Sequence, residues 1–245
     1  MDLNCDLGES FGRYTLGEDA ALMPLITSVN VACGFHAGDA LTMQRTVRLA
    51  GLHGVALGAH PGWLDLQGFG RRTMQVSAEE TEAFVLYQLG ALAAFAQAEG
   101  VTLRHVKPHG ALYNQAAHDP QLAAAVARAV QRFDSRLILV GLAGSHLPAA
   151  GAALGLRVAH EAFPDRGYNP DGSLMARHLP GALLHSAAAV AAHAVTLATE
   201  GIRIGGRALL PDTLCLHGDH AGAAENAQQV RAALMQAGVP IAPIA

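Results

Sequence analysis

The first residues with types and spacing suited to chemistry are an asparagine and an aspartate near the N-terminus. In the segment LNCDLGE, Asn4 and Asp6 flank Cys5, and Glu9 follows in a predicted loop. Successive side chains of a strand point to opposite sides, so Asn4 and Asp6 share one side and Cys5 points away. This pattern predicts a general base or a metal-ligating carboxylate at Asp6, oriented by Asn4, which is itself a candidate for substrate binding. The alternative is that Asp6 caps the loop that follows, as aspartate often does.

Two histidines follow the next two predicted strands. His36 lies between Gly34 and Gly38 in ACGFHAGD, and His60 has the corresponding place in GAHPGW. Glycines there permit positive φ and let backbone N–H groups approach an anionic ligand. Each histidine alone fits a structural hydrogen bond as well as a functional role. Together they predict substrate binding at His36 and His60.

Lys107 ends the fourth predicted strand, and His109 and Asn114 follow it in VKPHGALYN. Burying an ammonium group is costly unless a negative group compensates for it. We therefore expect Lys107 to stabilise a carboxylate, a phosphate or an oxyanion that forms during a reaction. The alternative is a structural ion pair with Asp6 or Glu161. His109 is a candidate general acid or base. Asn114 is a candidate to bind substrate or to orient Lys107 or His109.

The sixth predicted strand leads into the segment EAFPDRGYNPDGSL. Glu161 and Arg166 are candidates for substrate binding, because a guanidinium group forms a fork that fits a carboxylate. Asp171 stands in an Asn-Pro-Asp-Gly sequence, which is typical of a turn. A structural role is therefore predicted for Asp171.

The last predicted strand ends in LCLHGDHAGA, where His217 and Asp219 alternate on one side. In a closed sheet the first and last strands are neighbours, so Asp6, His217 and Asp219 are expected within reach of one another. Their chemistry fits an acid/base pair or a divalent metal site. The candidate metal ligands are Asp6, His36, His60 and His217.

The elements that must position these residues alternate between strand-like and helix-like segments. Short apolar runs without strict alternation are typical of parallel strands that are covered on both faces. Such runs cover residues 28–33, 54–59, 102–106, 137–142 and 214–216. Between them, apolar residues at helical spacing indicate helices that bury one side.

The positions of the polar residues favour one α/β architecture. Six of seven apolar runs end in a polar cluster. An open doubly wound sheet gathers functional residues at one crevice, whereas a barrel brings nearly every strand end to one mouth. We therefore predict a single domain over residues 1–245 that forms a distorted, seven-stranded (β/α) TIM-like barrel. Residues 201–211 break the alternation and are predicted to form a hairpin.

Composition is consistent with an enzyme that has a large core. Of the 245 residues, 51% are hydrophobic and 15% are charged, and the net charge of −4 comes without a basic run. These features argue against nucleic acid and anionic membranes as partners. No apolar stretch reaches the roughly 20 residues that span a bilayer, and no signal-peptide pattern is present, so a cytoplasmic protein is expected. The three cysteines, Cys5, Cys33 and Cys215, are widely spaced and are expected to be small buried hydrophobes.

Taken together, these segments resemble the motif blocks of the LamB/YcsF family over essentially the whole chain. The blocks, in order, are DLNCDLGES, NVACGFHAGD, GAHPGWLDLQGFGRR, VKPHGALYN, EAFPDRGYNPDGSL and LCLHGDHAGA. The resemblance implies a distorted barrel related to carbohydrate deacetylases and α-mannosidase-like barrels. It also implies the A subunit of a cytoplasmic 5-oxoprolinase, which acts with subunits B and C. That enzyme opens the lactam of 5-oxo-L-proline to L-glutamate while it cleaves ATP to ADP and phosphate.

The use of ATP, together with Mg²⁺, is implied by the resemblance alone. The chain contains neither a GxxxxGK[ST] motif nor a GxGxxG motif followed by the expected acidic residue. Phosphorylation of the lactam oxygen by ATP would create a leaving group, after which a water activated by a carboxylate could attack the carbon. We assign Asp6 or Asp219 as the base and His217 or His109 as the proton donor. Lys107 would stabilise the phosphoryl or oxyanion charge.

Two other classes of function fit the same residues. A metal-dependent deacetylase or amide hydrolase would activate water without ATP, using Asp6 and two histidines as ligands. The histidines available for this are His36, His60, His109 and His217. A non-catalytic scaffold would instead bind a carboxylated metabolite and pass it to a partner protein.

Overall fold

A closed barrel of parallel strands forms the centre of this computed structural model, which describes residues 1–216, 218 and 222–244. The strands are β1 (Asp2–Leu7), β2 (Ser28–Ala32), β3 (Ala56–His60), β4 (Leu103–Val106), β5 (Ile138–Leu142), β6 (Arg157–Ala162) and β9 (Thr213–Leu216). They neighbour one another in this order, and β9 closes the ring by pairing with both β6 and β1. The predicted seven-stranded barrel is confirmed, and so is the predicted pairing of the first and last strands.

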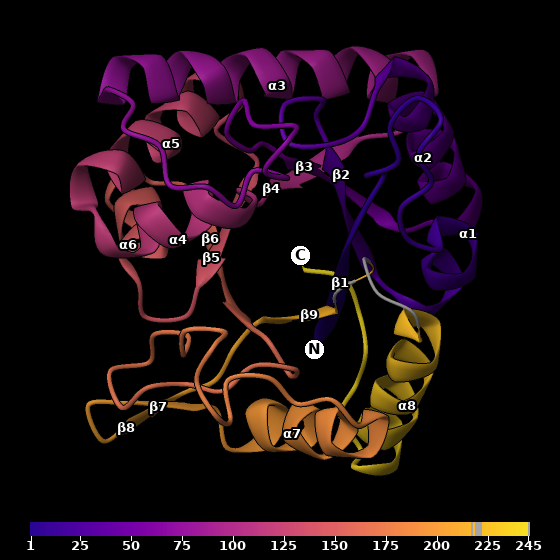
Figure 1. The fold of residues 1–245 in the computed structure, drawn as a ribbon, viewed down its shortest axis with the longest axis vertical. Coiled ribbons are helices and arrows are strands. Elements are labelled where there is room, and N and C mark those ends of the chain that lie inside the picture. The colour runs from indigo at the N-terminus through magenta and orange to yellow at the C-terminus, as the bar shows by residue number, and fades with distance from the viewer. Residues whose placement is uncertain (217, 219–221, 245) are drawn as a thin grey trace.

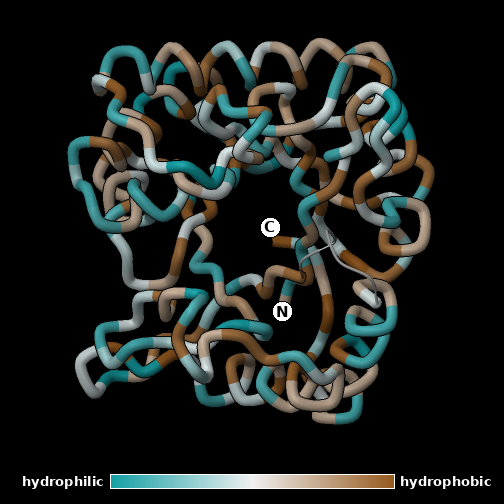
Figure 2. Tube along the Cα trace, viewed as in Figure 1, coloured by the Kyte–Doolittle hydropathy of each residue, from teal (hydrophilic) through white to brown (hydrophobic). Residues whose placement is uncertain are grey.

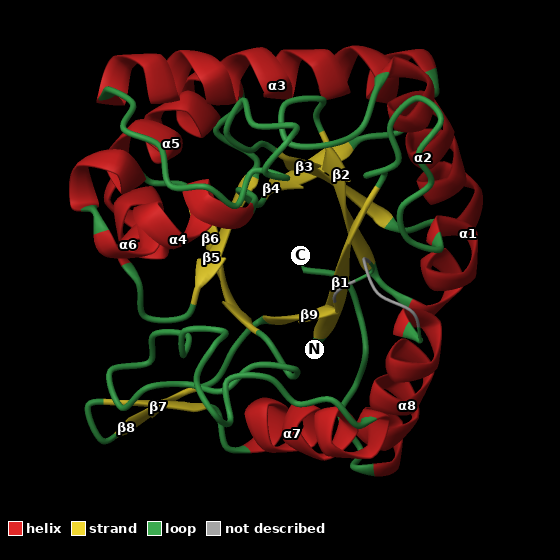
Figure 3. Ribbon diagram, in the orientation of Figure 1, coloured by secondary structure: helices red, strands yellow, loops and turns green. Residues whose placement is uncertain are grey.

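Helices surround the barrel on its outside, as Figures 1 and 3 show. They are α1 (Asp19–Leu22), the 3-10 helix η1 (Met23–Leu25), α2 (Ala40–His53), α3 (Ala78–Ala98), α4 (Gly110–His118), α5 (Pro120–Phe133), α6 (His146–Ala153), α7 (Ala187–Thr199) and α8 (Ala223–Gln236). Ser77 and Glu80 form a capping box at the start of α3, which fixes where that helix begins. Among the described residues, none of these helices is long and apolar enough to cross a membrane.

The core lies between the strands and the helices. Hydrophobic and hydrophilic residues alternate along the outer helices in Figure 2, so each helix turns one side to the barrel. On β1, Leu3, Cys5 and Leu7 join this apolar core, while Asn4 and Asp6 take part in polar contacts with other strands. The alternation predicted for β1 is therefore confirmed. The cysteines are free and buried, also as predicted.

Residues 201–211 lie apart from the barrel, where β7 (Ile202–Ile204) and β8 (Arg207–Leu209) form a separate antiparallel pair. Figure 3 shows this pair outside the ring of barrel strands, beside α7. The predicted hairpin is confirmed.

A register shift distorts the barrel where β3 meets β4, between Leu57 and Gly58. A side chain at Gly58 would overlap the buried imidazole of His105 on β4. Glycine therefore lets the His105 ring lie across the neighbouring strand, with Nε2 2.8 Å from Oδ1 of Asn30.

Replacing Gly58 by alanine is expected to lower the free energy of unfolding by about 1–3 kcal/mol, because the added methyl group displaces the His105 ring. Gly90 in α3 is the matched control, since a Cβ atom there meets nothing within 4 Å. Gly90→Ala should raise stability by about 0.5–1 kcal/mol. Urea unfolding of both variants measures the difference, and equal stabilities would contradict the close packing of Gly58 on His105.

Candidate active site

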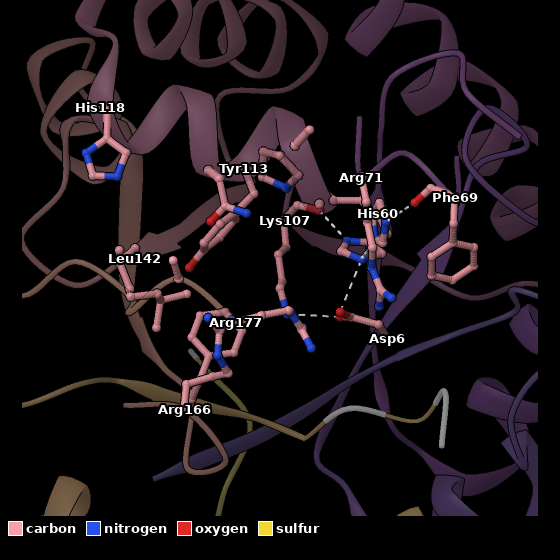
Figure 4. Close-up of a pocket in the computed structure, with 18 of the residues that line it drawn as sticks. Asp6, His60, Phe69, Arg71, Lys107, Tyr113, His118, Leu142, Arg166 and Arg177 are labelled. Carbon is pink, nitrogen blue, oxygen red and sulfur yellow. Dashed lines mark hydrogen bonds and ion pairs between the residues drawn. The ribbon is translucent and has the colours of Figure 1, made fainter. Parts of the chain in front are cut away.

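Asp6 at the end of β1 is held by three other strands. Oδ1 of Asp6 accepts hydrogen bonds from Nζ of Lys107 at 2.9 Å and from Nδ2 of Asn30 at 2.8 Å. Oδ2 lies 3.3 Å from Nε2 of His60 (Figure 4). Because β1, β2, β3 and β4 are neighbours in the barrel, their carboxyl ends bring these groups together. The carboxylate is thus fixed in position and lines a cavity.

Lys107 is buried at the centre of an anionic and polar cage. Its Nζ lies 2.9 Å from a carboxylate oxygen of Asp6, 2.9 Å from Oε1 of Glu161 and 3.1 Å from Oδ1 of Asn4. Burial alone would lower the pKa of Lys107, but the carboxylates of Asp6 and Glu161 outweigh it and hold the pKa well above its usual value. Lys107 is therefore a fixed cation, and both ion pairs weighed for it in the sequence are present.

Asn4 connects the groups around Lys107 to Thr213 on β9. Its Nδ2 donates to Oε1 of Glu161 at 2.9 Å and to Oγ1 of Thr213 at 2.7 Å, while Oδ1 accepts from Asn30. Asn4 and Glu161, which were predicted to bind substrate, both contact Lys107. Their substrate-binding role stays a prediction. Asn30 and His105 were not identified from the sequence. Each is a polar residue inside one of the apolar runs predicted as strands, and that pattern could have pointed to them.

Three histidines and a glutamate gather beside Asp6. The ring nitrogens and one carboxylate oxygen of Glu9, His36, His60 and His109 all lie within 4.8 Å of one another. Nδ1 of His109 is 3.1 Å from Nε2 of His60, and the His36 and His109 rings stack with centroids 3.7 Å apart. The structure therefore brings together three of the four candidate histidines, His36, His60 and His109, and adds Glu9 to them.

The outer nitrogens of two of these rings face backbone carbonyl groups. Nδ1 of His60 lies 2.7 Å from the oxygen of Lys107, and Nε2 of His109 lies 2.8 Å from the oxygen of Phe69. Phe69 has φ of 54°, a left-handed conformation that is unusual for a bulky residue. This conformation aims the Phe69 carbonyl at the His109 ring, and a strained residue at such a place is typical of functional sites.

Burial shifts the basicity of the enclosed histidines. It lowers the pKa of His36 and of His109 well below the usual 6.5, and the neighbouring histidines add to the shift. Burial also lowers the pKa of His105 to about 3. Because the doubly protonated form is disfavoured, His36 and His109 are neutral, and each keeps one ring nitrogen with a lone pair.

A cavity of about 400 Å³ opens above Asp6, Lys107 and His109. This size falls within the about 300–1,000 Å³ of ligand pockets in general. Arg71, Arg166 and Arg177 line its wall, and Figure 4 shows Arg166 and Arg177 on the side opposite His60. The three guanidinium groups outnumber the carboxylates of Asp6 and Glu9 in the lining, so this wall fits an anionic ligand.

Two of the N–H donors of Arg166 form hydrogen bonds with backbone oxygens of the protein. Its Nη2 donates to the oxygen of Met175 at 2.7 Å and its Nε to the oxygen of Ala182 at 3.3 Å. Burial and the nearby Arg177 lower the pKa of Arg166. The predicted carboxylate fork at Arg166 therefore mainly holds the loop that carries Arg177, which the sequence did not single out.

Of the remaining predicted residues, the structure describes Asn114 and Asp171 but not His217 and Asp219. Asn114 is exposed on the cavity rim, and among the described residues its side chain makes no hydrogen bond to Lys107 or His109. Asp171 accepts from the backbone and side chain of Ser173, as predicted for a turn. His217 and Asp219 lie outside the described residues, so their predicted approach to Asp6 stays a prediction.

Glu9 was noted in the sequence only as a loop residue. It is buried, and its Oε1 lies 3.4 Å from Nε2 of His36 and 3.9 Å from Nδ1 of His109. A signal was available, because an acidic residue between Gly8 and Ser10 follows a strand that already ends in Asp6. The turn that folds it back onto the histidines could not be read from spacing.

Comparisons with known proteins converge on one family. The LamB/YcsF family profile matches residues 1–245. The chain is 56% identical to the A subunit of 5-oxoprolinase from Tolumonas auensis, covering 98% of both chains, and 51% identical to that from Thermococcus onnurineus, covering 100% of this chain and 97% of the relative. The crystal structure of a lactam utilization protein from Thermus thermophilus aligns with a TM-score of 0.93 and 47% identity, covering 100% of this chain and 99% of that one. This chain therefore belongs to the LamB/YcsF family.

Proposed function

We propose that this chain is the A subunit of an ATP-dependent 5-oxoprolinase. In this function it acts with subunits B and C in the cytoplasm and opens the lactam of 5-oxo-L-proline to L-glutamate, while ATP with Mg²⁺ is cleaved to ADP and phosphate. The full-length similarity to 5-oxoprolinase A subunits and to a lactam utilization protein supports the proposal. The observation in the structure that carries it is the Asp6–Lys107 pair under a cationic cavity.

The chemistry of a lactam explains why such a pair is useful. A five-membered lactam is a resonance-stabilised amide, so its carbonyl oxygen must be activated before water can attack the carbon. Transfer of the γ-phosphoryl group of ATP to that oxygen supplies the activation. Water then adds to the carbon, and the C–N bond breaks as the nitrogen takes up a proton, which leaves an acyl phosphate. A second water attacks the same carbon and releases phosphate that carries the lactam oxygen. Lys107 is fixed where it can stabilise the charge on the phosphoryl group or on the tetrahedral intermediate.

Asp6 is the proposed base that activates the attacking water. It lines the cavity, and its carboxylate is oriented by Asn30 and Lys107. His109, which also lines the cavity, is the proposed proton donor to the lactam nitrogen. Because its pKa is well below 6.5, His109 must first take up that proton during the reaction. His217 and Asp219 remain the alternatives for the donor and the base.

Omission of single components tests the proposed function. The chain is co-expressed with subunits B and C, and glutamate release from labelled 5-oxo-L-proline is measured with and without ATP. Glutamate is expected only when ATP and all three subunits are present. A folded, assembled complex that releases no glutamate would contradict the proposal.

A metal-dependent amide hydrolase is the second candidate function, and the buried cluster of Glu9 with three histidines favours it. Such an enzyme would activate water without a nucleotide. The same assay separates the two functions, because amide hydrolysis by the isolated chain without ATP supports only the second.

Arg177→Ala is expected to raise KM for 5-oxo-L-proline about 10- to 100-fold with a smaller effect on kcat, since a hydrogen bond to a charged group contributes about 1.5–3 kcal/mol. The reason is that Arg177 lines the cavity and we assign it to the substrate carboxylate. Arg203→Ala in β7 is the control, because Arg203 is exposed and does not line this cavity. An unchanged KM in Arg177→Ala would show that the carboxylate binds elsewhere.

A further inference from the structure

We propose that Glu9, His36, His60 and His109 form a binding site for a divalent transition-metal ion. This cluster lies next to Asp6 at the floor of the cavity. The proposal rests on the geometry of the cluster and does not require the lactam reaction, so binding of the metal tests it without any turnover.

The spacing of the candidate ligand atoms fits a single ion. Ligands at about 2.1 Å from a metal in a tetrahedron lie about 3.4 Å from one another. Here Nε2 of His60 and Nδ1 of His109 are 3.1 Å apart, and Oε1 of Glu9 is 3.9 Å from Nδ1 of His109. Oε1 of Glu9 is also 3.4 Å from Nε2 of His36. These three separations suit atoms arranged around one ion, and all the candidate ligand atoms lie within 4.8 Å of one another.

The hydrogen bonds on the outer side of the cluster fix which nitrogens carry lone pairs. The carbonyl oxygens of Lys107 and Phe69 can only accept, so Nδ1 of His60 and Nε2 of His109 must be the protonated nitrogens. The two inner nitrogens of the neutral rings then face each other across 3.1 Å with lone pairs on both. Such an arrangement is repulsive unless a cation lies against both nitrogens, and ligating histidines commonly have their other nitrogen held by a carbonyl in this way.

His36 provides an independent observation. Its side chain is fully buried, and within the described part of the chain neither ring nitrogen has a hydrogen-bond partner. A buried polar group without a hydrogen bond is costly, and metal coordination would satisfy Nε2. The ring is stacked parallel to His109, with an angle of 4° between the planes. In the present ring orientations Glu9, His60 and His109 would hold the ion, and coordination by His36 would require its ring to turn out of the stack.

The chemistry of the donors selects the class of metal. Three imidazoles and one carboxylate favour zinc, cobalt or nickel over magnesium or calcium, which prefer oxygen ligands. The carboxylate of Glu9 within the cluster supplies a negative charge for a divalent ion, and Oδ2 of Asp6 lies 3.3 Å from Nε2 of His60. When bound, such an ion would polarise the lactam carbonyl or lower the pKa of a water next to Asp6.

Metal uptake by the chain, stripped with a chelator and then dialysed against Zn²⁺, tests the proposal. We expect about one zinc ion per chain by elemental analysis, and Co²⁺ should give the visible absorption of a four- or five-coordinate site. Glu9→Gln and His109→Gln should weaken Zn²⁺ binding at least about 100-fold, more than the loss of an outer partner of a ligand. His53→Gln is the control, because His53 is exposed at the end of α2.

Circular dichroism establishes whether each variant is folded. Glu9→Gln keeps the size of the side chain, so it serves if His109→Gln does not fold. A folded wild-type chain that binds no zinc or cobalt would overturn the proposal and leave a shared proton between His60 and His109 as the alternative. Stoichiometric binding that persists in both variants would overturn it as well, since the ion would then lie elsewhere.

Discussion

Replacing Asp6 by asparagine is expected to lower kcat of the reconstituted complex by about 10²–10⁴-fold, the usual contribution of a positioned acid or base. Asparagine has the same shape and can still accept from Asn30 and Lys107 through its carbonyl oxygen, but it cannot take a proton from water. KM should change much less than kcat, because the cationic wall of the cavity is retained.

The control for Asp6→Asn is Asp171→Asn, which removes a carboxylate from an exposed turn. Thermal unfolding of both variants should stay close to that of the wild type, since Lys107 keeps its ion pair with Glu161 in the first variant. An Asp6→Asn complex that turns over at the wild-type rate would exclude Asp6 as the base and leave Asp219.

Lys107→Met is the second change with a large expected effect, and it acts first on stability. Removing the ammonium group leaves the carboxylates of Asp6 and Glu161 without their shared cation in a buried site. Breaking a buried pair in this way costs about 3–5 kcal/mol, because an uncompensated charge stays behind. Urea unfolding at neutral pH measures the loss.

Two further variants separate this explanation from lost packing. Adding Glu161→Gln to Lys107→Met removes one of the two stranded charges and should recover part of the stability, a coupling that a double-mutant cycle measures. Arg136→Met deletes a cation from an exposed pair with Asp134 and should leave stability unchanged. If Lys107→Met has the same free energy of unfolding as the wild type, the ammonium group of Lys107 is not needed to stabilise Asp6 and Glu161.

Much of the fold was readable from the sequence because strands, helices and polar strand ends follow simple periodicities. Asn4 and Asp6 share a side of β1 because side chains alternate along a strand, and β1 meets β9 because the barrel closes. Lys107 was a candidate for a similar reason, since a cation at the end of a buried strand needs a partner. These features depend on local spacing and one topological choice.

The contacts within the histidine cluster could not be predicted from the sequence. Glu9, His36 and His109 meet through loops, and the conformation of those loops depends on contacts such as the left-handed Phe69 and its carbonyl. No period in the sequence encodes such contacts. Arg166 illustrates the same limit, because spacing could not show that its donors hold the backbone of its own loop.

The fate of the lactam oxygen tests the central claim most directly. The reconstituted complex is given ATP and 5-oxo-L-proline that carries ¹⁸O in the ring carbonyl, and the products are analysed by mass spectrometry after a single turnover. Activation by phosphorylation of that oxygen predicts one ¹⁸O atom in the released phosphate. Phosphate without label, with all ¹⁸O kept in glutamate, would contradict the proposed mechanism and favour direct hydrolysis.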